Sequence, residues 1–452
     1  MKKRHIFSGV LAALVVGGAT AAYVASPTAY AGNQGEAPEL GRMGENVIGT
    51  TTREYSLADR TRISAMDALS GSVEDSERVL TVRFWYPASA PDDGAKPARY
   101  AWTLTPTGRP EVAISSQGIA FPGANPLAEG KFPLVLMSHG FNGWDTQFSN
   151  LGEHIASRGY VVASINHADA PIEGITDFLV SFLNVLTDRT QDQRQVLAQI
   201  ISGANDGSAP AAELIDTETI GLIGYSMGGY GALATAGAPY DFTNDPLSNL
   251  PEPAQEQLRI ATAQAAPIKA MVTFAPWGGQ PANRAWSKQS LAKIGIPTLI
   301  VTGSEDDVVN YKDGVRWLFD NLTGAERHML VFREARHNIV GNKFEMPDDT
   351  EFTAIEYLNE PVWRSDRLNA INQHFVTAFF DWKLKGDESK RSYLELPTTN
   401  SNDSNWETGF GDQLNGEFAG ADQPEHWRGF QRRWAVGLEM HSAQAGESDA
   451  GN

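Results

Sequence analysis

The chain has 452 residues, 41% of them hydrophobic and 10% aromatic, so it can bury a large core and is not intrinsically disordered. Its formal net charge of −19 disfavours binding to nucleic acid or to anionic membranes. The absence of cysteine excludes disulfides, thiolate metal sites and a cysteine nucleophile.

The first residues have the composition of an export signal. A basic stretch at residues 2–4 precedes an apolar run over residues 6–24, and the tripeptide at 29–31, Ala-Tyr-Ala, has the small-x-small pattern of a cleavage site. We therefore expect residues 1–31 to be a signal peptide, cleaved after Ala31. The mature protein is then secreted or periplasmic, with no stable membrane span. Because the apolar run is long for a signal core, an uncleaved membrane anchor is the alternative.

Short apolar runs bounded by turn residues alternate with helical patterns through much of the chain. Several runs are apolar throughout, as expected of strands buried on both faces of a parallel sheet. The predicted strands are 80–85, 133–137, 160–165, 219–223, 268–274, 297–301 and 329–332. The predicted helices are 150–157, 188–201, 226–236 and 311–321. This alternation predicts an α/β fold with a mostly parallel, doubly wound sheet.

Two segments interrupt the alternation, and a third departs from it at the end of the chain. Residues 239–266 and 341–366 are rich in proline and polar residues, and we expect them to be lid or rim insertions over a site. The catalytic domain is expected over residues 44–386. A polar tail follows over 387–452, in which residues 426–440 become aromatic and apolar again and are expected to pack back on the domain.

The stretch "TIGLIGYSMGGYGALATAG", beginning at Thr219, contains a sharp change of structure. Gly224, Ser226 and Gly228 form a G-x-S-x-G pattern between a predicted strand and a predicted helix. In such a turn the serine takes a strained backbone conformation, and glycine neighbours allow the strand and the helix to approach closely. We therefore predict Ser226 as a nucleophile exposed at the carboxyl end of the sheet.

A serine nucleophile needs a base, and the base needs an orienting acid, which follow the serine in the order acid and then histidine in this arrangement. After the predicted strand at 297–301 the chain offers Glu305, Asp306 and Asp307. We predict Asp306, because three residues past Gly303 the turn can bring its carboxylate back towards the sheet. Asp307 is the second choice.

The general base must follow this acid and lie just past a strand. His337 meets both conditions, since it follows the predicted strand at 329–332. His328 begins that strand and His374 lies within a helical pattern, while the other later histidines are His426 and His441. We therefore predict His337 as the base.

Acyl transfer also requires N–H donors for the oxyanion of the tetrahedral intermediate. We predict the backbone N–H groups of Met227, directly after the nucleophile, and of Phe141, in the loop after the predicted strand 133–137. We expect four side chains to line the pocket: His139, Tyr225, His167 and Trp277. Loop-stabilising roles for the two histidines and a packing role for Trp277 are the alternatives. No metal site is predicted, because the oxygen-rich run at 400–412 lacks the spacing of a calcium loop.

These motifs resemble the α/β-hydrolase superfamily, and more narrowly its branch of platelet-activating factor acetylhydrolases and predicted dienelactone hydrolases. The resemblance spans about residues 47–386. It rests on "VIGTTTREYSLADRTR", "VRFWYPAS", "LVLMSHGFNG", "LGEHIASRGYVVASINHAD", "GYSMGG" and "INQHFVTAFFDWKLKGD". It implies an α/β-hydrolase fold with a Ser-His-Asp triad, no metal or organic cofactor, and a small-molecule ester or lipid as substrate.

The expected activity is hydrolysis of short to medium acyl esters through an acyl-enzyme on Ser226. A phospholipid acetylhydrolase is the first alternative. A peptidase or lyase on the same fold and a catalytically inactive binding protein are the others.

Overall fold

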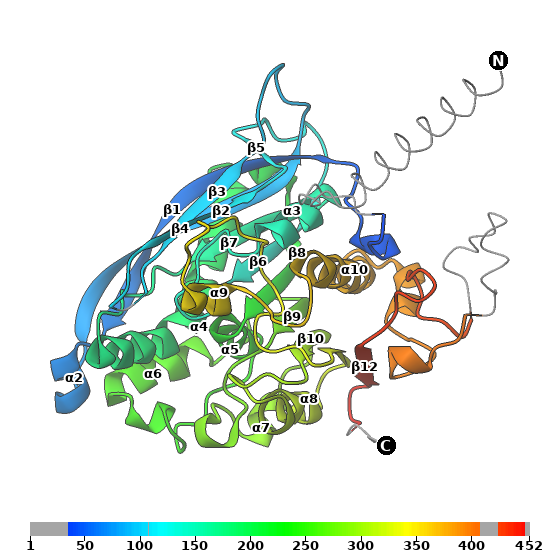
Figure 1. The fold of residues 1–452 in the computed structure, drawn as a ribbon. Helices are drawn as coiled ribbons and strands as arrows, with labels where there is room; N and C mark the ends of the chain where they lie inside the picture. The colour runs from blue at the N-terminus through cyan, green and yellow to red at the C-terminus, as the bar shows by residue number, and fades with distance from the viewer. Residues whose placement is uncertain (1–34, 107, 407–423, 448–452) are drawn as a thin grey trace, which may run out of the picture. The chain divides into compact units, whose positions relative to one another are not determined.

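The computed structural model describes residues 35–106, 108–406 and 424–447 (Figure 1). The predicted signal peptide with its cleavage site, and part of the polar tail, lie outside the described residues. Within them, ten strands form one sheet in the order β12-β11-β10-β9-β8-β6-β7-β2-β1-β5. These strands are β1 (Val47–Arg62), β2 (Glu74–Ala88), β5 (Phe121–Pro122), β6 (Phe132–Ser138), β7 (Val161–Asn166), β8 (Ile215–Tyr225), β9 (Ala270–Phe274), β10 (Thr298–Gly303), β11 (Arg327–Phe332) and β12 (Leu438–Ala443).

The central strands β7, β6, β8, β9, β10 and β11 are parallel to one another, whereas β2 pairs antiparallel with β7, β1 with β2, and β12 with β11. The predicted α/β fold with a mostly parallel sheet is therefore confirmed. A separate hairpin pairs β3 (Arg99–Leu104) with β4 (Val112–Gln117).

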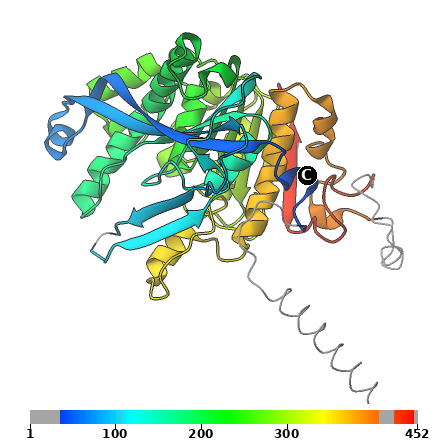
Figure 2. The same ribbon diagram turned by 90° about the horizontal axis from the view of Figure 1, so that it is seen from above.

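Helices cover both faces of the sheet. Their bounds are α2 (Ala65–Ser70), α3 (Ser149–Ser157), α4 (Ile175–Asp206), α5 (Met227–Thr235), α6 (Glu252–Ala261), α7 (Lys288–Leu291), α8 (Arg316–Asn321), α9 (Phe352–Leu358) and α10 (Ser365–Lys383). Successive side chains of a strand point to opposite faces. A Cβ on Gly221 of β8 would touch Leu384 and Phe380, whereas one on Gly224 would meet the first turn of α5. Since these glycines are three residues apart, α10 and α5 lie on opposite faces. Figure 2 shows helices on either side of the central strands.

The short apolar runs identify the central strands because both of their faces are buried. Residues 134–137 of β6 and 299–301 of β10 have no exposed surface. Several elements differ from expectation, and the two longest of them are β1 and α4. The strand β1 was not predicted, because its buried and exposed residues alternate irregularly over 16 positions. The helix α4 begins at Ile175, well before the predicted start at residue 188.

The predicted insertions lie in different places. Residues 239–266 include α6, which packs beside α4, and Gln257 of α6 is hydrogen bonded to Thr61 of β1 at 2.9 Å. Residues 341–366 include α9, whose Tyr357 hydroxyl donates to the carbonyls of Phe141 and Asn142 at 3.3 and 3.2 Å. In the described residues, these hydrogen bonds tie the second segment to the loop that carries Phe141, and its role as a lid stays a prediction.

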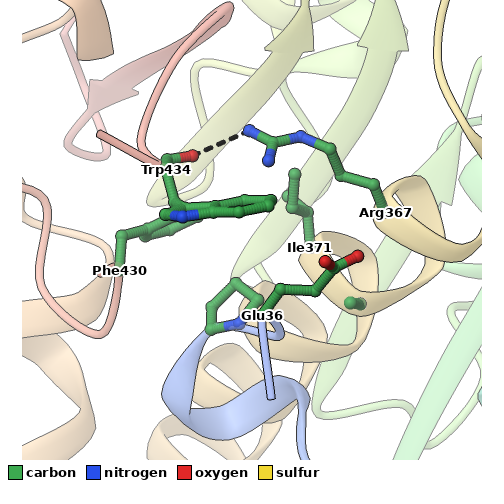
Figure 3. A pocket seen from close by; sticks show the side chains of 7 residues that line it. Glu36, Arg367, Ile371, Phe430 and Trp434 are labelled. Carbon is green, nitrogen blue, oxygen red and sulfur yellow. Dashed lines mark hydrogen bonds between the residues drawn. The ribbon is translucent and has the colours of Figure 1, made fainter. Parts of the chain in front are cut away.

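The C-terminal aromatic segment packs on α10. Figure 3 shows Trp434 and Phe430 beside Arg367, whose guanidinium donates to the Trp434 carbonyl at 2.7 Å. The cavity between these residues and Glu36 holds about 10 Å³, which is room for about one water molecule. This contact therefore joins segments near the two ends of the described chain without leaving space for a ligand.

Among the described helices, none has both the length and the apolar character needed to cross a bilayer.

Candidate active site

Ser226 occupies the turn between β8 and α5. Its backbone has φ 52° and ψ −113°, a conformation that is uncommon for a residue with a side chain. Its N–H donates to the Phe274 carbonyl at 2.9 Å, and its carbonyl accepts from the Trp277 N–H at 3.1 Å. Both bonds fix the turn to the end of β9. The strained conformation is therefore held by the neighbouring strand.

The glycines on either side of Ser226 have no room for a side chain. A Cβ on Gly224 would lie 2.4 Å from the Gly228 carbonyl oxygen, and a Cβ on Gly228 would lie 2.1 Å from the Ser138 carbonyl oxygen. Both distances are far shorter than any non-bonded carbon–oxygen contact. The G-x-S-x-G pattern thus follows from the close approach of α5 to β8 and β6.

The side chains of Ser226, His337 and Asp306 form one hydrogen-bonded line. His337 Nε2 lies 3.1 Å from Ser226 Oγ, and His337 Nδ1 lies 2.8 Å from Asp306 Oδ2. The three residues follow β8, β11 and β10, so the carboxyl ends of parallel strands deliver all of them to one edge of the sheet. The Asp306 carboxylate is fully buried, whereas 13% of the His337 side chain is exposed.

The three neighbouring acids after β10 point in different directions. Asp306 Oδ1 accepts from the backbone N–H groups of Val308 and Val309, both at 3.0 Å, and this turn aims Oδ2 at His337. Asp307 instead forms an exposed ion pair with Arg336 at 2.7 Å, and Glu305 is exposed. Asp306 is thus the acid that reaches the imidazole.

The two predicted oxyanion donors lie beside Ser226. Met227 follows it directly, and a Cβ on Gly140 would lie 3.2 Å from Ser226 Cβ, so the segment that carries Phe141 passes next to the serine. Among the described hydrogen bonds, neither the Phe141 nor the Met227 backbone N–H has an acceptor in the protein.

The four expected pocket residues differ in exposure. His139 and His167 are completely buried, so they support the loop from beneath instead of lining an accessible surface. His139 Nε2 accepts from the His167 N–H at 3.0 Å, and its Nδ1 is hydrogen bonded to the Gly140 carbonyl at 2.7 Å. Burial also holds the pKa of His139 well below 6.5, which keeps the ring neutral.

Tyr225 and Trp277 lie closer to the line of Ser226, His337 and Asp306. The Tyr225 ring lies 5.2 Å from the His337 ring, and its hydroxyl donates to the His337 carbonyl at 3.4 Å. The Trp277 ring packs edge-to-face on Phe182 of α4 at 5.5 Å. Both side chains are more than nine-tenths buried.

Aromatic side chains of α4 lie beside Phe141 and Trp277, and they were not among the predicted site residues. Phe178 and Phe182 pack edge-to-face on Phe141, at 5.8 and 6.1 Å between ring centroids. Their signal was present in the sequence, because the apolar residues at 175, 178, 179 and 182 have the i, i+3, i+4, i+7 spacing of a helix face. Ile175 and Leu179 are mostly exposed, so the first two turns of α4 present apolar surface beside Phe141.

A second Ser-His-Asp line, formed by Ser138, His167 and Asp192, is buried inside the protein. Ser138 Oγ lies 2.7 Å from His167 Nε2, and His167 Nδ1 lies 2.8 Å from Asp192 Oδ2. All three side chains are completely buried, and burial lowers the pKa of His167 to about 4. This line cannot meet a substrate, and it ties β6, β7 and α4 together.

In the described part of the chain, no group of three or more His, Asp or Glu side chains is arranged to hold a metal ion.

Comparisons with known proteins match the part of the chain around the nucleophile. A family model described as PETase, PET hydrolase-like, matches residues 117–241, which include Phe141 and Ser226 but neither Asp306 nor His337. Cutinase 2 of Thermobifida cellulosilytica is 25% identical over 218 residues, which cover 47% of this chain and 63% of that protein. Cutinase cut1 of Thermobifida fusca is also 25% identical over 218 residues, covering 47% of this chain and 51% of its own length.

The matches to these relatives thus span between about half and two thirds of their length. Together with the mostly parallel sheet and the strand-turn-helix position of Ser226, these similarities indicate an α/β-hydrolase fold.

Proposed function

We propose that this protein is an exported serine carboxylic-ester hydrolase that acts on short to medium acyl esters through an acyl-enzyme. The observation that carries the proposal is the unbroken line from Ser226 Oγ to His337 and Asp306, with distances of 3.1 and 2.8 Å. The names of the relatives, cutinases and a PET hydrolase-like family, support ester cleavage as the reaction class.

In the first half of the reaction, His337 Nε2 accepts the Ser226 hydroxyl proton while Oγ attacks the carbonyl carbon of the ester. The carbonyl oxygen becomes an oxyanion, and the N–H groups of Phe141 and Met227 donate to it. His337 then returns the proton to the leaving alcohol, which leaves the acyl group on Ser226. The buried Asp306 holds the tautomer with the proton on Nδ1 and stabilises the imidazolium.

In the second half, water takes the place of the alcohol. His337 removes a proton from this water, the hydroxide adds to the acyl carbon, and collapse of the intermediate releases the acid and the Ser226 hydroxyl. The aromatic wall formed by Phe141, Phe182 and Trp277 supports an apolar acyl or alcohol group beside the serine.

The proposal is tested with p-nitrophenyl acetate, butyrate and palmitate beside a peptide amide. Wild-type protein should cleave acetate and butyrate faster than palmitate and should leave the amide intact. Ser226→Ala should lower turnover by at least about a thousandfold without lowering the melting temperature, because alanine tolerates this backbone no worse than serine. The exposed Ser208→Ala is the matched control. Retention of more than a tenth of wild-type turnover by Ser226→Ala would overturn the assignment.

The same panel separates the alternative activities. Cleavage of an acetylated phospholipid in preference to the nitrophenyl esters would move the function to a phospholipid acetylhydrolase. Cleavage of the amide would indicate a peptidase, and no turnover of any substrate would leave a binding protein. Export is proposed from the sequence of residues 1–31, and N-terminal sequencing of the exported protein tests it.

A further inference from the structure

The loop that carries Phe141 is held by a buried ion pair from two other elements. Arg189 comes from the middle of α4, and Asp169 follows β7. Arg189 Nη1 donates to Asp169 Oδ1 at 2.7 Å. The Arg189 side chain has no exposed surface and that of Asp169 is 2% exposed, so neither charge is screened by water.

Both partners of this ion pair bind the loop backbone. Arg189 Nη2 donates to the Gly140 carbonyl oxygen at 2.9 Å, and Asp169 Oδ2 accepts from the Asn142 N–H at 2.7 Å. Arg189 and Asp169 therefore form a clamp around the Gly140–Phe141 peptide group. Arg189 binds the oxygen of this peptide, and Asp169 binds the N–H of the next peptide, at Asn142.

The clamp decides where the Phe141 N–H points. In a trans peptide the C=O and the following N–H are coplanar and point in opposite directions. Arg189 and His139 Nδ1 bind the Gly140 oxygen on the buried side, at 2.9 and 2.7 Å, so the Phe141 N–H is turned away from them. The same peptide passes next to Ser226, since a Cβ on Gly140 would lie 3.2 Å from Ser226 Cβ.

We infer that Arg189 and Asp169 are positioning residues for the oxyanion hole, which fix the Gly140–Phe141 peptide so that the Phe141 N–H is presented to the developing negative charge. This inference rests on the proposed esterase function. Without the clamp, His139 Nδ1 is the described partner that still holds the Gly140 oxygen, and glycine at position 140 permits both orientations of the peptide plane at little cost. A rotated peptide places its carbonyl oxygen where the oxyanion forms.

The Asp169 carboxylate stays ionised at neutral pH. Burial favours the neutral form of Asp169, but the Arg189 guanidinium outweighs this effect and lowers the pKa of the carboxyl to about 2. The clamp therefore acts as a permanent ion pair. Loss of either partner leaves an uncompensated buried charge next to the loop, which adds to the loss of the hydrogen bond.

The test compares Arg189→Lys, Arg189→Met and Asp169→Asn with wild type. Arg327→Lys is the matched control, because Arg327 is also fully buried and donates to the carbonyls of Phe319 and Glu447 at 2.7 Å, but lies at the opposite end of its strand from the site. The measurements are kcat and KM for p-nitrophenyl butyrate, the melting temperature, and the inhibition constant of n-butylboronic acid, which forms a tetrahedral adduct on serine.

Arg189→Met and Asp169→Asn should lower kcat about a hundredfold, as loss of one oxyanion donor does in other acyl-transfer enzymes, and should change KM less than threefold. Affinity for the boronic acid should fall by a similar factor, because the adduct resembles the transition state. Arg189→Lys should lie between these variants and wild type. Arg327→Lys should lower the melting temperature but keep kcat and boronic acid affinity within threefold.

A purely structural role would lower the melting temperature of the Arg189 and Asp169 variants while kcat and boronic acid affinity stay within threefold of wild type, and this result would overturn the inference. If Arg189→Met does not fold, Arg189→Lys and Asp169→Asn decide the question. Failure of the proposed function is distinguishable, because wild type would then lack esterase activity or Ser226→Ala would retain it.

Discussion

Replacing Asp306 by asparagine should nearly abolish esterase activity, whereas the same change at Asp307 should not. The carboxylate of Asp306 uses Oδ1 to accept from the Val308 and Val309 N–H groups and Oδ2 to accept from His337 Nδ1. An asparagine has one oxygen and one NH₂ group for these two sides. With its oxygen on the two backbone donors, its NH₂ group faces the imidazole.

The imidazole must then accept at Nδ1 and carry its proton on Nε2, which faces Ser226 and can no longer remove the hydroxyl proton. Loss of this tautomer control reduces turnover about ten-thousandfold in a serine protease, or about 5.4 kcal/mol of transition-state stabilisation. Asp307 forms only an exposed ion pair with Arg336, and such pairs contribute about 0–1 kcal/mol, so its replacement should reduce turnover less than about tenfold.

The assay measures kcat for p-nitrophenyl butyrate with both variants at one pH, with melting temperatures to verify folding. The opposite ranking would identify Asp307 as the acid and leave the triad hypothesis standing. If neither variant lost more than tenfold, the acid would have to come from another strand end, and the described line would not be the catalytic one.

Three further predictions concern stability and processing. Gly228→Ala should destabilise the protein by more than about 3 kcal/mol in urea unfolding, because its methyl group would meet the Ser138 carbonyl oxygen at 2.1 Å, whereas Gly295→Ala, with nothing within 4 Å, should change stability by less than about 1 kcal/mol. Burial raises the pKa of Glu153 from 4.5 to about 7, so between these pH values the folded state holds a proton that the unfolded state has lost. The free energy of unfolding should therefore fall as the pH rises from about 5 to 7, and Glu153→Gln should remove up to about 3 kcal/mol of this fall. An equally steep decrease of the unfolding free energy with pH in the variant would count against this prediction. N-terminal sequencing of the exported protein should begin at Gly32, and an intact Met1 in a membrane fraction would instead support the anchor.

The sequence predicted the central sheet well because burial on both faces leaves a simple signal. Uninterrupted apolar runs have few other interpretations, and the glycine spacing around Ser226 follows from backbone contacts that admit no side chain. The long strand β1 lacks such a signal, since its buried and exposed positions do not alternate regularly and Arg60, a charged residue, is among the buried ones. The start of α4 was overlooked although its signal is present, because the apolar residues at 175, 178, 179 and 182 already have the spacing of a helix face.

The site was predictable to the level of chain order but not of side-chain direction. Chain order and strand ends are enough to propose Ser226, an acid after β10 and His337. The choice between Asp306 and Asp307 depends on a turn in which two backbone N–H groups bind one carboxylate oxygen, and a sequence does not specify that geometry. The clamp of Arg189 and Asp169 is similarly invisible, because it joins residues 20 positions apart through the backbone of a third segment.

The buried line of Ser138, His167 and Asp192 shows how little interatomic distance alone says about reactivity. A geometric template of serine, histidine and carboxylate would retrieve both lines, since their hydrogen-bond lengths differ by only a few tenths of an ångström. Ser138 ends a regular strand, and its hydroxyl also accepts from Gln193 at 2.9 Å, whereas Ser226 lies on a strained turn next to unused backbone donors. Template searches for hydrolases therefore separate active from buried lines better when they also require a positive serine φ and unpaired N–H groups nearby. These two criteria reject the line of Ser138 and retain the line of Ser226.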